Sequence, residues 1–161
     1  MISKIKPCLW FDNRAEEAAN FYISVFPNSK ILNISYYSGE GKEQHGHNEG
    51  DVLVVNFELD GSPVMILNGG PHFKFTEAVS LVVEVDTQEE LDHYWNALSS
   101  VPEAEQCGWC KDRYGLSWQI VPKAMMEFIL SEDRAATDRA MAAMMQMHKL
   151  DIATLKKAFA G

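Results

Sequence analysis

Two cysteines stand in Cys107-Gly108-Trp109-Cys110, the Cys-x-x-Cys spacing of thiol oxidoreductases. That chemistry needs the first cysteine at the start of a helix, where the dipole lowers the thiol pKa. The following residues, KDRYGLSW, instead predict a turn and a strand. Zinc would require a second pair of ligands, which Cys8 alone does not supply. We therefore expect strand cysteines that line or underlie a binding surface, with an oxidisable thiol as the alternative.

Histidines could supply acid-base chemistry or metal ligands at two places. His45 and His47 could chelate a metal from one strand face, but their very polar loop favours solvated side chains or a mobile flap. His72, in the loop GGPHFKF, could act as a general acid or base, although a loop histidine without an identified partner is more often structural. Arg113, in a predicted turn, could clamp a carboxylate or phosphate, with a surface ion pair as the default.

The first half of the chain predicts a strand, a helix and three further strands. The opening strand covers Lys6 to Phe11, and Asn13 with Glu16 resembles a capping box at the start of a helix. That helix ends before Pro27. Three strand candidates follow, and Asp60-Gly61 is a hairpin signal between the last two: SKILNISYY, VLVVNFEL and SPVMILN.

The second half repeats this pattern. A strand over Ala78 to Val85 precedes a capping box of Thr87 and Glu90 and an apolar helical stripe, and extended pieces ending in LSWQIVP follow. Aligning the halves with one insertion places Asp12 on Asp86, Phe21 on Tyr94 and Tyr22 on Trp95. An internal repeat of this size predicts two similar modules whose sheets complete one another.

Beyond Pro122 the sequence predicts helices with methionines on their apolar faces, over Met125 to Leu130, Asp133 to His148 and Asp151 to Phe159. Exposed methionines could form an adaptable binding surface. Packing of this tail on its own domain or on a second subunit is the favoured interpretation.

Bulk composition excludes several classes of partner. The 161 residues are 47% hydrophobic, which suits one globular domain with a proper core. A formal net charge of −9 disfavours nucleic acid and anionic membranes. No apolar stretch has the length of a membrane span or the core of a signal peptide, and three cysteines fit a reducing compartment. We expect a cytoplasmic protein.

Three long phrases resemble the PhnB-like branch of the glyoxalase/bleomycin-resistance (vicinal oxygen chelate) superfamily: MILNGGPHFKFTEAVSLVVEVDTQEELDHYW, QCGWCKDRYGLSWQIVP and AMAAMMQMHKLDIATLKKAF. The resemblance implies an α+β fold in which two βαβββ modules, about 1–70 and 77–123, form an open cleft. The paired modules would span 1–123, with a C-terminal helical extension over 124–161 and a homodimer as the expected assembly. The superfamily holds isomerases, dioxygenases, antibiotic-modifying enzymes and metal-free drug-binding proteins, so the fold implies no single activity.

This branch often bears the name 3-demethylubiquinone-9 3-methyltransferase domain. A methyl-donor site of the usual kind needs a Gly-rich turn from strand to helix. Neither FDNRAEE nor VDTQEE offers one. Methyl transfer is therefore not expected.

The resemblance also indicates where a divalent ion would bind in metal-dependent relatives, with one ligand from the first and the last strand of each module. In this chain those positions hold Lys6 or Pro7, Ile66, Ser80 and Gln119. Divalent ions prefer carboxylate and imidazole ligands, and Gln119 is a neutral amide. We predict no metal site and no cofactor.

Strand alternation places Ser80 and Glu84 on one face, and Ser117 and Gln119 on the matching face of the final strand, toward the cleft. Gln119 would be either a ligand-orienting amide or a structural hydrogen bonder. The predicted contacts of a small organic ligand are Gln119, Ser80, Glu84, Ser117, Asn68, His72 and Trp109. The alternative is a superfamily enzyme, isomerase, lyase or transferase-like, with altered or recruited metal ligands and His72 as its candidate catalytic residue.

Overall fold

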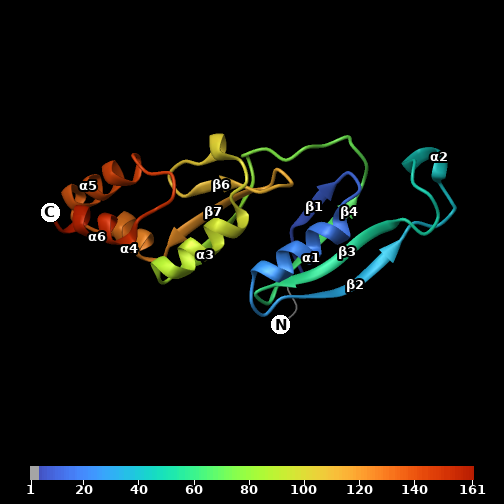
Figure 1. Ribbon diagram of the computed structural model, residues 1–161, viewed down its shortest axis with the longest axis horizontal. Coiled ribbons are helices and arrows are strands. Elements are labelled where there is room, and N and C mark those ends of the chain that lie inside the picture. Colours follow the sequence, from blue (N-terminus) through green and yellow to red (C-terminus); the bar gives the residue numbers. More distant parts are fainter. Residues whose placement is uncertain (1–3) are drawn as a thin grey trace. The chain divides into compact units, whose positions relative to one another are not determined.

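A computed structural model describes residues 4–161 and shows an α+β protein with two small sheets (Figure 1). The chain divides into two compact units, Met1–Lys74 and Phe75–Gly161. The first unit contains the first predicted module. The second unit contains the other module together with the C-terminal helices.

The first unit has the predicted βαβββ order. Its sheet runs β1-β4-β3-β2, with β1 parallel to β4 and the other neighbours antiparallel. A four-residue helix, α2, lies in the predicted polar loop, and Gly41 and Gly46 adopt positive φ at its two ends. The elements are β1 (Cys8–Phe11), α1 (Ala15–Val25), β2 (Lys30–Tyr36), α2 (Lys42–His45), β3 (Val52–Leu59) and β4 (Ser62–Asn68).

Turn and cap chemistry explain how these elements are joined. Asp60 and Gly61 have φ of +46° and +74°, as a two-residue hairpin turn between β3 and β4 requires, so that prediction is confirmed. The capping box predicted from Asn13 and Glu16 is wrong. The cap position of α1 is Arg14, whose side chain makes no capping hydrogen bond.

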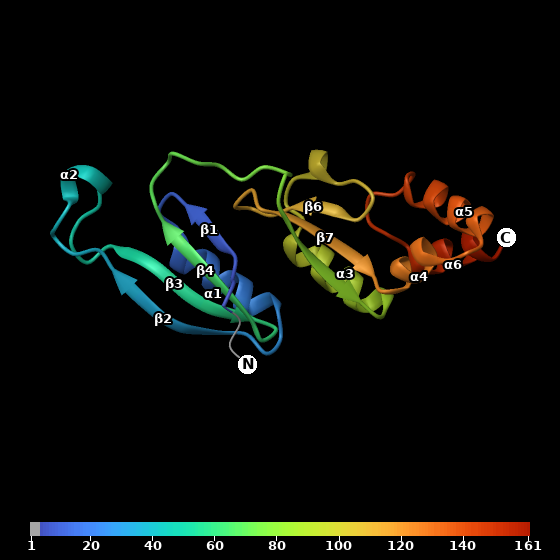
Figure 2. The same ribbon diagram turned by 180° about the vertical axis from the view of Figure 1, so that it is seen from behind.

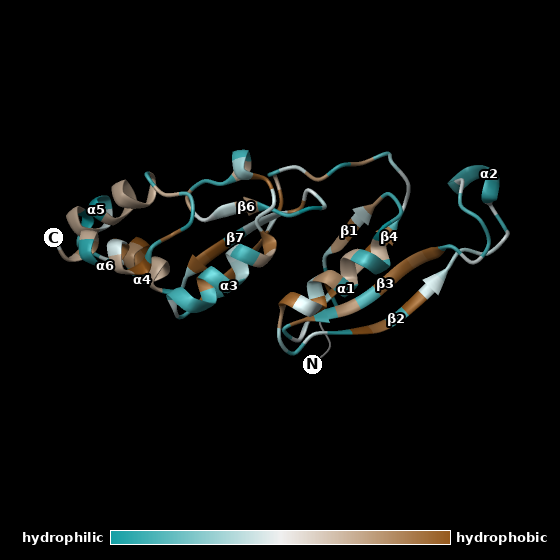
Figure 3. Ribbon diagram, in the orientation of Figure 1, coloured by the Kyte–Doolittle hydropathy of each residue, from teal (hydrophilic) through white to brown (hydrophobic). Residues whose placement is uncertain are grey.

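The core of the first unit lies between α1 and one face of its sheet. Alanines at the start and middle of α1 allow close approach, and the Tyr22 ring stacks parallel to Phe57 of β3 at a centroid distance of 6.5 Å. Hydrophobic colour follows much of β3 beneath the helix (Figure 3). The fully buried residues here are Ala15, Ala18, Ala19, Tyr22, Val55, Phe57 and Ile66.

The second unit has a smaller sheet of order β5-β7-β6, in which β5 is parallel to β7 and β6 antiparallel to it. It has one strand fewer than the first sheet. Pro102 opens a 3₁₀ turn before β6, since proline has no N–H to donate to a strand ladder. The elements are β5 (Ser80–Val85), α3 (Gln88–Leu98), η1 (Pro102–Ala104), β6 (Trp109–Lys111), β7 (Ser117–Pro122), α4 (Ala124–Leu130), α5 (Arg134–Met144) and α6 (Ile152–Ala160).

Helix α3 covers one face of this second sheet (Figures 1 and 2). Its predicted capping box is confirmed. The Thr87 side chain accepts the backbone N–H of Glu90, and the Glu90 side chain accepts the backbone N–H of Thr87. Trp95 is buried on α3, as Tyr22 is on α1. The same aligned position thus faces the core in both units, which agrees with an internal repeat.

The C-terminal helices pack on the second module, as one of the favoured interpretations expected. The backbone N–H groups of Cys107 and Gly108 donate to the carbonyls of Met147 and His148, each at 2.8 Å. The long predicted helix ends at Met144, four residues before His148, and a turn carries the chain into α6. Within residues 4–161, no helix has both the length and the apolarity to cross a membrane.

Candidate functional site

The sheet face of the second unit that points away from α3 gathers most of the predicted ligand-binding residues. Strand register sets its side chains in rows. The first row is Ser80, Ser117 and Lys111, the second is Val82, Gln119 and Trp109, and the third contains Glu84 and Val121. We call these eight side chains the open face. Val82 is 55% exposed, whereas alternate residues such as Trp118 and Ile120 are buried on the side of α3.

A hydrogen bond between strands positions the predicted amide. Gln119 Nε2 donates to Ser80 Oγ at 2.9 Å, from β7 to β5. The serine oxygen accepts this bond, so its own O–H proton remains available to a ligand. The amide is only half-buried. Gln119 is thus held in place by a neighbour on a face that also exposes apolar surface.

Ser117 and Lys111 complete the first row of the open face. Ser117 is 1% exposed, and its Oγ has no hydrogen-bond partner among residues 4–161. The ammonium of Lys111 donates to a carboxylate oxygen of Glu77. This hydrogen bond from Lys111, aided by the backbone of Glu77, holds the pKa of Glu77 below its ordinary value. The row therefore carries two hydroxyls and an ion pair.

A hollow of about 370 Å³ adjoins the open face at Trp109. Its volume is within the range of small-molecule sites. We call it the Trp109 hollow, and its lining residues are Glu77, Ala104, Gln106, Cys107 and Trp109. The Trp109 side chain lies in the second row of the open face and also lines the Trp109 hollow.

Lys111 and Glu77 were not singled out by the sequence patterns. A signal for Lys111 was nevertheless present. The predicted turn around Arg113 closes the hairpin between β6 and β7, and this register puts Lys111 opposite Ser117. Glu77 offered no such signal, because it precedes β5 in a segment without regular structure.

The two cysteines of the Cys-x-x-Cys stretch have different environments. Cys110 lies on the covered face of β6, where burial first, and then the carboxylates of Asp112 and Glu105, raise the pKa of its thiol to about 12. Cys107 occupies a turn with φ of +52°, half-buried, with its Sγ 3.8 Å from the Sδ of Met145. Neither begins a helix, so the arrangement does not fit a thiol oxidoreductase.

Asn68 and His72, the other predicted ligand contacts, belong to the first unit. Asn68 is 5% exposed, its Oδ1 accepts the N–H of Ala15 at 2.9 Å, and its Nδ2 donates to the carbonyl of Val52 at 3.0 Å. His72 is exposed in the segment after β4, which the indole of Trp10 holds by donating to the carbonyl of Gly70. Their roles as ligand contacts stay predictions.

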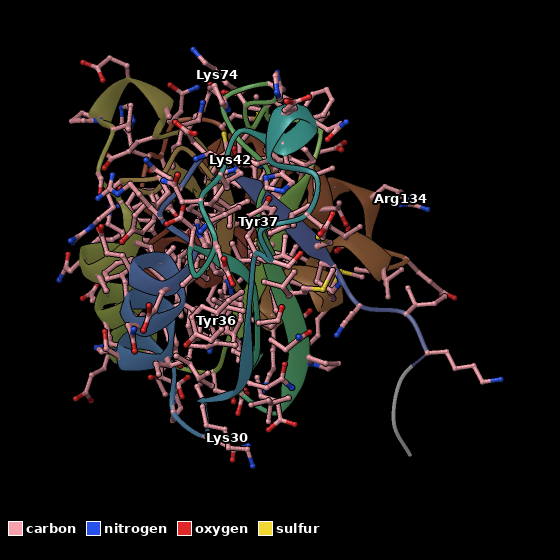
Figure 4. All side chains as sticks on the ribbon, turned by 90° about the vertical axis from the view of Figure 1, so that its right-hand side faces the viewer. Lys30, Tyr36, Tyr37, Lys42, Lys74 and Arg134 are labelled. Atoms are coloured by element: carbon pink, nitrogen blue, oxygen red, sulfur yellow. The ribbon has the colours of Figure 1, made fainter. Side chains whose placement is uncertain are left out.

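The histidine pair is ordered around an aromatic ring. The ring centroid of Tyr37 lies 4.5 Å from that of His45 and 4.4 Å from that of His47, and the two histidine centroids are 6.0 Å apart. Figure 4 looks onto this end of the first unit. The tyrosine hydroxyl donates to the carbonyl of Asn68 at 2.5 Å. His47 also lines a hollow of about 540 Å³ whose wall carries four carboxylates, those of Asp12, Glu16, Glu17 and Asp51.

The residues at the superfamily's metal positions do not fit a divalent ion. Lys6 donates through its ammonium to Asn56 Oδ1 at 2.5 Å, and an ammonium has no lone pair to offer. Ile66 is fully buried in the core. Ser80 Oγ is bound to Gln119. Within residues 4–161, no group of three or more His, Cys, Asp or Glu side chains could hold a metal ion.

A family model and a solved structure each match most of this chain. The family described as 3-demethylubiquinone-9 3-methyltransferase matches residues 3–121. The PhnB protein of Bacillus cereus, a structure named as a 3-demethylubiquinone-9 3-methyltransferase, shares 36% identity over 74% of this chain and 99% of its own, with a TM-score of 0.61. A search of curated proteins finds no match.

Two other solved structures are similar to this chain at lower identity. Protein PA1353 from Pseudomonas aeruginosa is 16% identical over 75% of this chain and 98% of its own, with a TM-score of 0.56. A glyoxylase/bleomycin resistance protein/dioxygenase domain from Frankia sp. EAN1pec is 13% identical over 76% of this chain and 93% of its own, with a TM-score of 0.45.

Two modules, each a small sheet with a helix against one face, define an α+β protein. The chain belongs to the PhnB-like family described as 3-demethylubiquinone-9 3-methyltransferase. The predicted resemblance and fold class are confirmed.

Proposed function

We propose that the protein binds a small organic molecule on the open face of the second unit. The observation that carries this proposal is the hydrogen bond of 2.9 Å that fixes Gln119 to Ser80 beside exposed apolar surface. A fixed amide can orient a polar group of a ligand without a further entropic cost. The adjoining Trp109 hollow supplies volume and an aromatic wall for the rest of the molecule.

The family's name describes methyl transfer, and we do not extend that activity to this chain. The turns that lead from β1 into α1 and from β5 into α3 are Asp12-Asn13-Arg14 and Asp86-Thr87. Both lack the glycines that let a backbone approach a bound nucleoside closely. The two turns therefore give no support for methyl transfer.

We also propose a homodimer that works in the cytoplasm. The three cysteines are free, as in proteins of reducing compartments. Helix α4 exposes apolar side chains that a second copy would cover: Met126 at 49%, Ile129 at 43% and Leu130 at 73%. Light scattering of the wild-type protein and of Leu130→Glu tests the dimer, and a wild-type monomer would contradict it.

A thermal-shift screen of diverse small metabolites tests ligand binding. At a concentration of about 100 times its Kd, a ligand adds about 2.7 kcal/mol of stability. We expect such stabilisation to be lost in Gln119→Leu and in Trp109→Ala. The matched control is Gln44→Leu, because Gln44 is an exposed glutamine of the first unit.

Three outcomes distinguish the possible functions. Equal stabilisation of the wild type and Gln119→Leu would place the ligand elsewhere, and no stabilisation by any compound would contradict a binding role. Turnover of a bound compound would identify an enzyme, with loss of turnover in His72→Ala as the check on the predicted catalytic residue.

A further inference from the structure

The first row of the open face is rich in hydrogen-bond donors. Ser80 lies opposite Ser117 and Ser117 opposite Lys111, so three polar side chains lie in line across neighbouring strands. The Ser80 hydroxyl accepts from Gln119 and keeps its proton to donate. Ser117 has a buried hydroxyl without a partner among residues 4–161. A buried, unpaired hydroxyl is unfavourable unless something binds it.

Lys111 adds a positive charge whose partner is exchangeable. The Lys111 side chain is 21% exposed, whereas the Glu77 side chain bound to it is 65% exposed. The Lys111 ammonium meets Glu77 at an exposed hydrogen bond, so the carboxylate can exchange for water or for another anion at low cost. Glu77 lies in a turn that precedes β5, so the ion pair joins Lys111 to a residue outside the sheet.

The second row and the Trp109 hollow offer a surface for the apolar part of a ligand. Trp109 precedes Lys111 by two residues on the same face of β6, and it also lines the Trp109 hollow with Ala104. A planar apolar group would stack on an indole there. The distance between alternate residues of a strand, about 7 Å, matches an aromatic ring with one acidic substituent.

We propose that the ligand of the open face is an aromatic carboxylate, whose carboxylate displaces Glu77 from Lys111 and accepts hydrogen bonds from the hydroxyls of Ser117 and Ser80. This inference rests on the proposed binding function and specifies its ligand class. Glu77 occupies the carboxylate position while the site is empty. It therefore competes with the ligand and sets its affinity.

Benzoate and benzamide are suitable probes, because they share a shape and differ in charge. NMR titration of each compound follows the indole N–H of Trp109 and the side-chain amide of Gln119, which report on this face. We expect benzoate to bind at least about fivefold more tightly than benzamide, as charge-assisted hydrogen bonds predict. Glu77→Gln should tighten benzoate about fivefold, and Lys111→Met should weaken it at least about tenfold, with benzamide unchanged.

The ion pair of Lys123 and Asp86, at 2.6 Å in the same unit, provides matched controls. Lys123→Met and Asp86→Asn change the net charge as Lys111→Met and Glu77→Gln do, but at residues outside the first row. Benzoate affinity should therefore change less than about twofold in these two variants. Ser117→Ala tests the unpaired hydroxyl and should weaken benzoate more than benzamide, because only benzoate makes a charge-assisted hydrogen bond there.

Equal binding of benzoate and benzamide at Trp109 would overturn the carboxylate assignment and leave a binding function intact. Tightening of benzoate by Asp86→Asn as strongly as by Glu77→Gln would show a general charge effect and also overturn it. If neither compound moves the signals of Trp109 or Gln119, the aromatic carboxylate class is excluded, and the metabolite screen alone then decides the binding function.

Discussion

The carboxamide oxygen of Asn68 accepts the backbone N–H of Ala15 at 2.9 Å, so the last residue of β4 caps the first turn of α1. Its amide nitrogen donates to the carbonyl of Val52 in the neighbouring strand, and its backbone carbonyl accepts the hydroxyl of Tyr37. The Asn68 side chain thus joins the sheet to the helix, and its backbone holds Tyr37 of the β2–β3 connection. The first unit depends on it structurally.

Replacement of Asn68 by alanine should destabilise the first unit strongly. The N–H of Ala15 and the carbonyl of Val52 would lose their partners at a position 5% exposed, for a loss of about 2 to 3 kcal/mol in unfolding free energy. Urea unfolding measures it. Asn20→Ala is the control, since Asn20 bonds an exposed helix carbonyl and should cost below about 0.5 kcal/mol. Equal losses in the two variants would contradict the capping role.

Local patterns predicted the elements of the chain well where the decisive contacts are near in sequence. Apolar alternation gave the strands, and Thr87 with Glu90 gave the start of α3. The predicted cap of α1 was wrong because the backbone N–H of Ala15 bonds to Asn68, which lies 53 residues away in the sequence. No local pattern at Asn13 could show that a distant strand would supply the bond.

The candidate site was predictable to the extent that it depends on strand alternation. Ser80 and Gln119 were assigned to one face from their strands alone, and they are hydrogen-bonded across that face. Glu77 could not be assigned, because its position on Lys111 depends on the path of an irregular segment. The second sheet has three strands and not the expected four, and a 3₁₀ turn that begins at Pro102 stands between α3 and β6.

Gly108 should be required for docking of the C-terminal helices. It has φ of +86°, and a Cβ there would lie 3.0 Å from Leu150 and 3.1 Å from the carbonyl of Ile120. Gly115 has the same φ but open space around it. Gly115→Ala should therefore cost about 1 kcal/mol of backbone strain, and Gly108→Ala at least about 2 kcal/mol more, in urea unfolding. Similar losses would show that the contact with Leu150 is unimportant.

The cysteines should react with iodoacetamide in an order set by their environments. Burial keeps the Cys110 thiol protonated, so it should stay unmodified in the folded protein and react in urea. Cys8 is exposed and Cys107 half-buried, and both should be labelled. Mass spectrometry of digested protein gives the sites, with Cys107→Ser as the control that removes one label. Labelling of Cys110 without unfolding would contradict its buried position.

The start of α6 should weaken in acid. Hydrogen bonds from Thr154 hold the pKa of Asp151 below its ordinary value of 3.8, and its Oδ1 accepts the N–H of Thr154 at 2.6 Å. Because the pKa of Asp151 is lower in the folded than in the unfolded state, the carboxylate stabilises α6 fully above the unfolded-state pKa. This stabilisation is lost as the pH falls through the folded-state pKa. Asp151→Ala should destabilise the helix by about 1 kcal/mol at neutral pH.

Hydrogen exchange of α6 amides measures this effect at about pH 7 and about pH 3. The difference between the wild type and Asp151→Ala should shrink at the lower pH, because protonation removes the charge from the wild-type cap. Asp138, an exposed aspartate within α5, is the control, and Asp138→Ala should leave α6 unchanged at both values. A difference between the wild type and Asp151→Ala that grows as the pH falls would be the opposite of the expected sign, and would show that the ionised carboxylate does not stabilise α6.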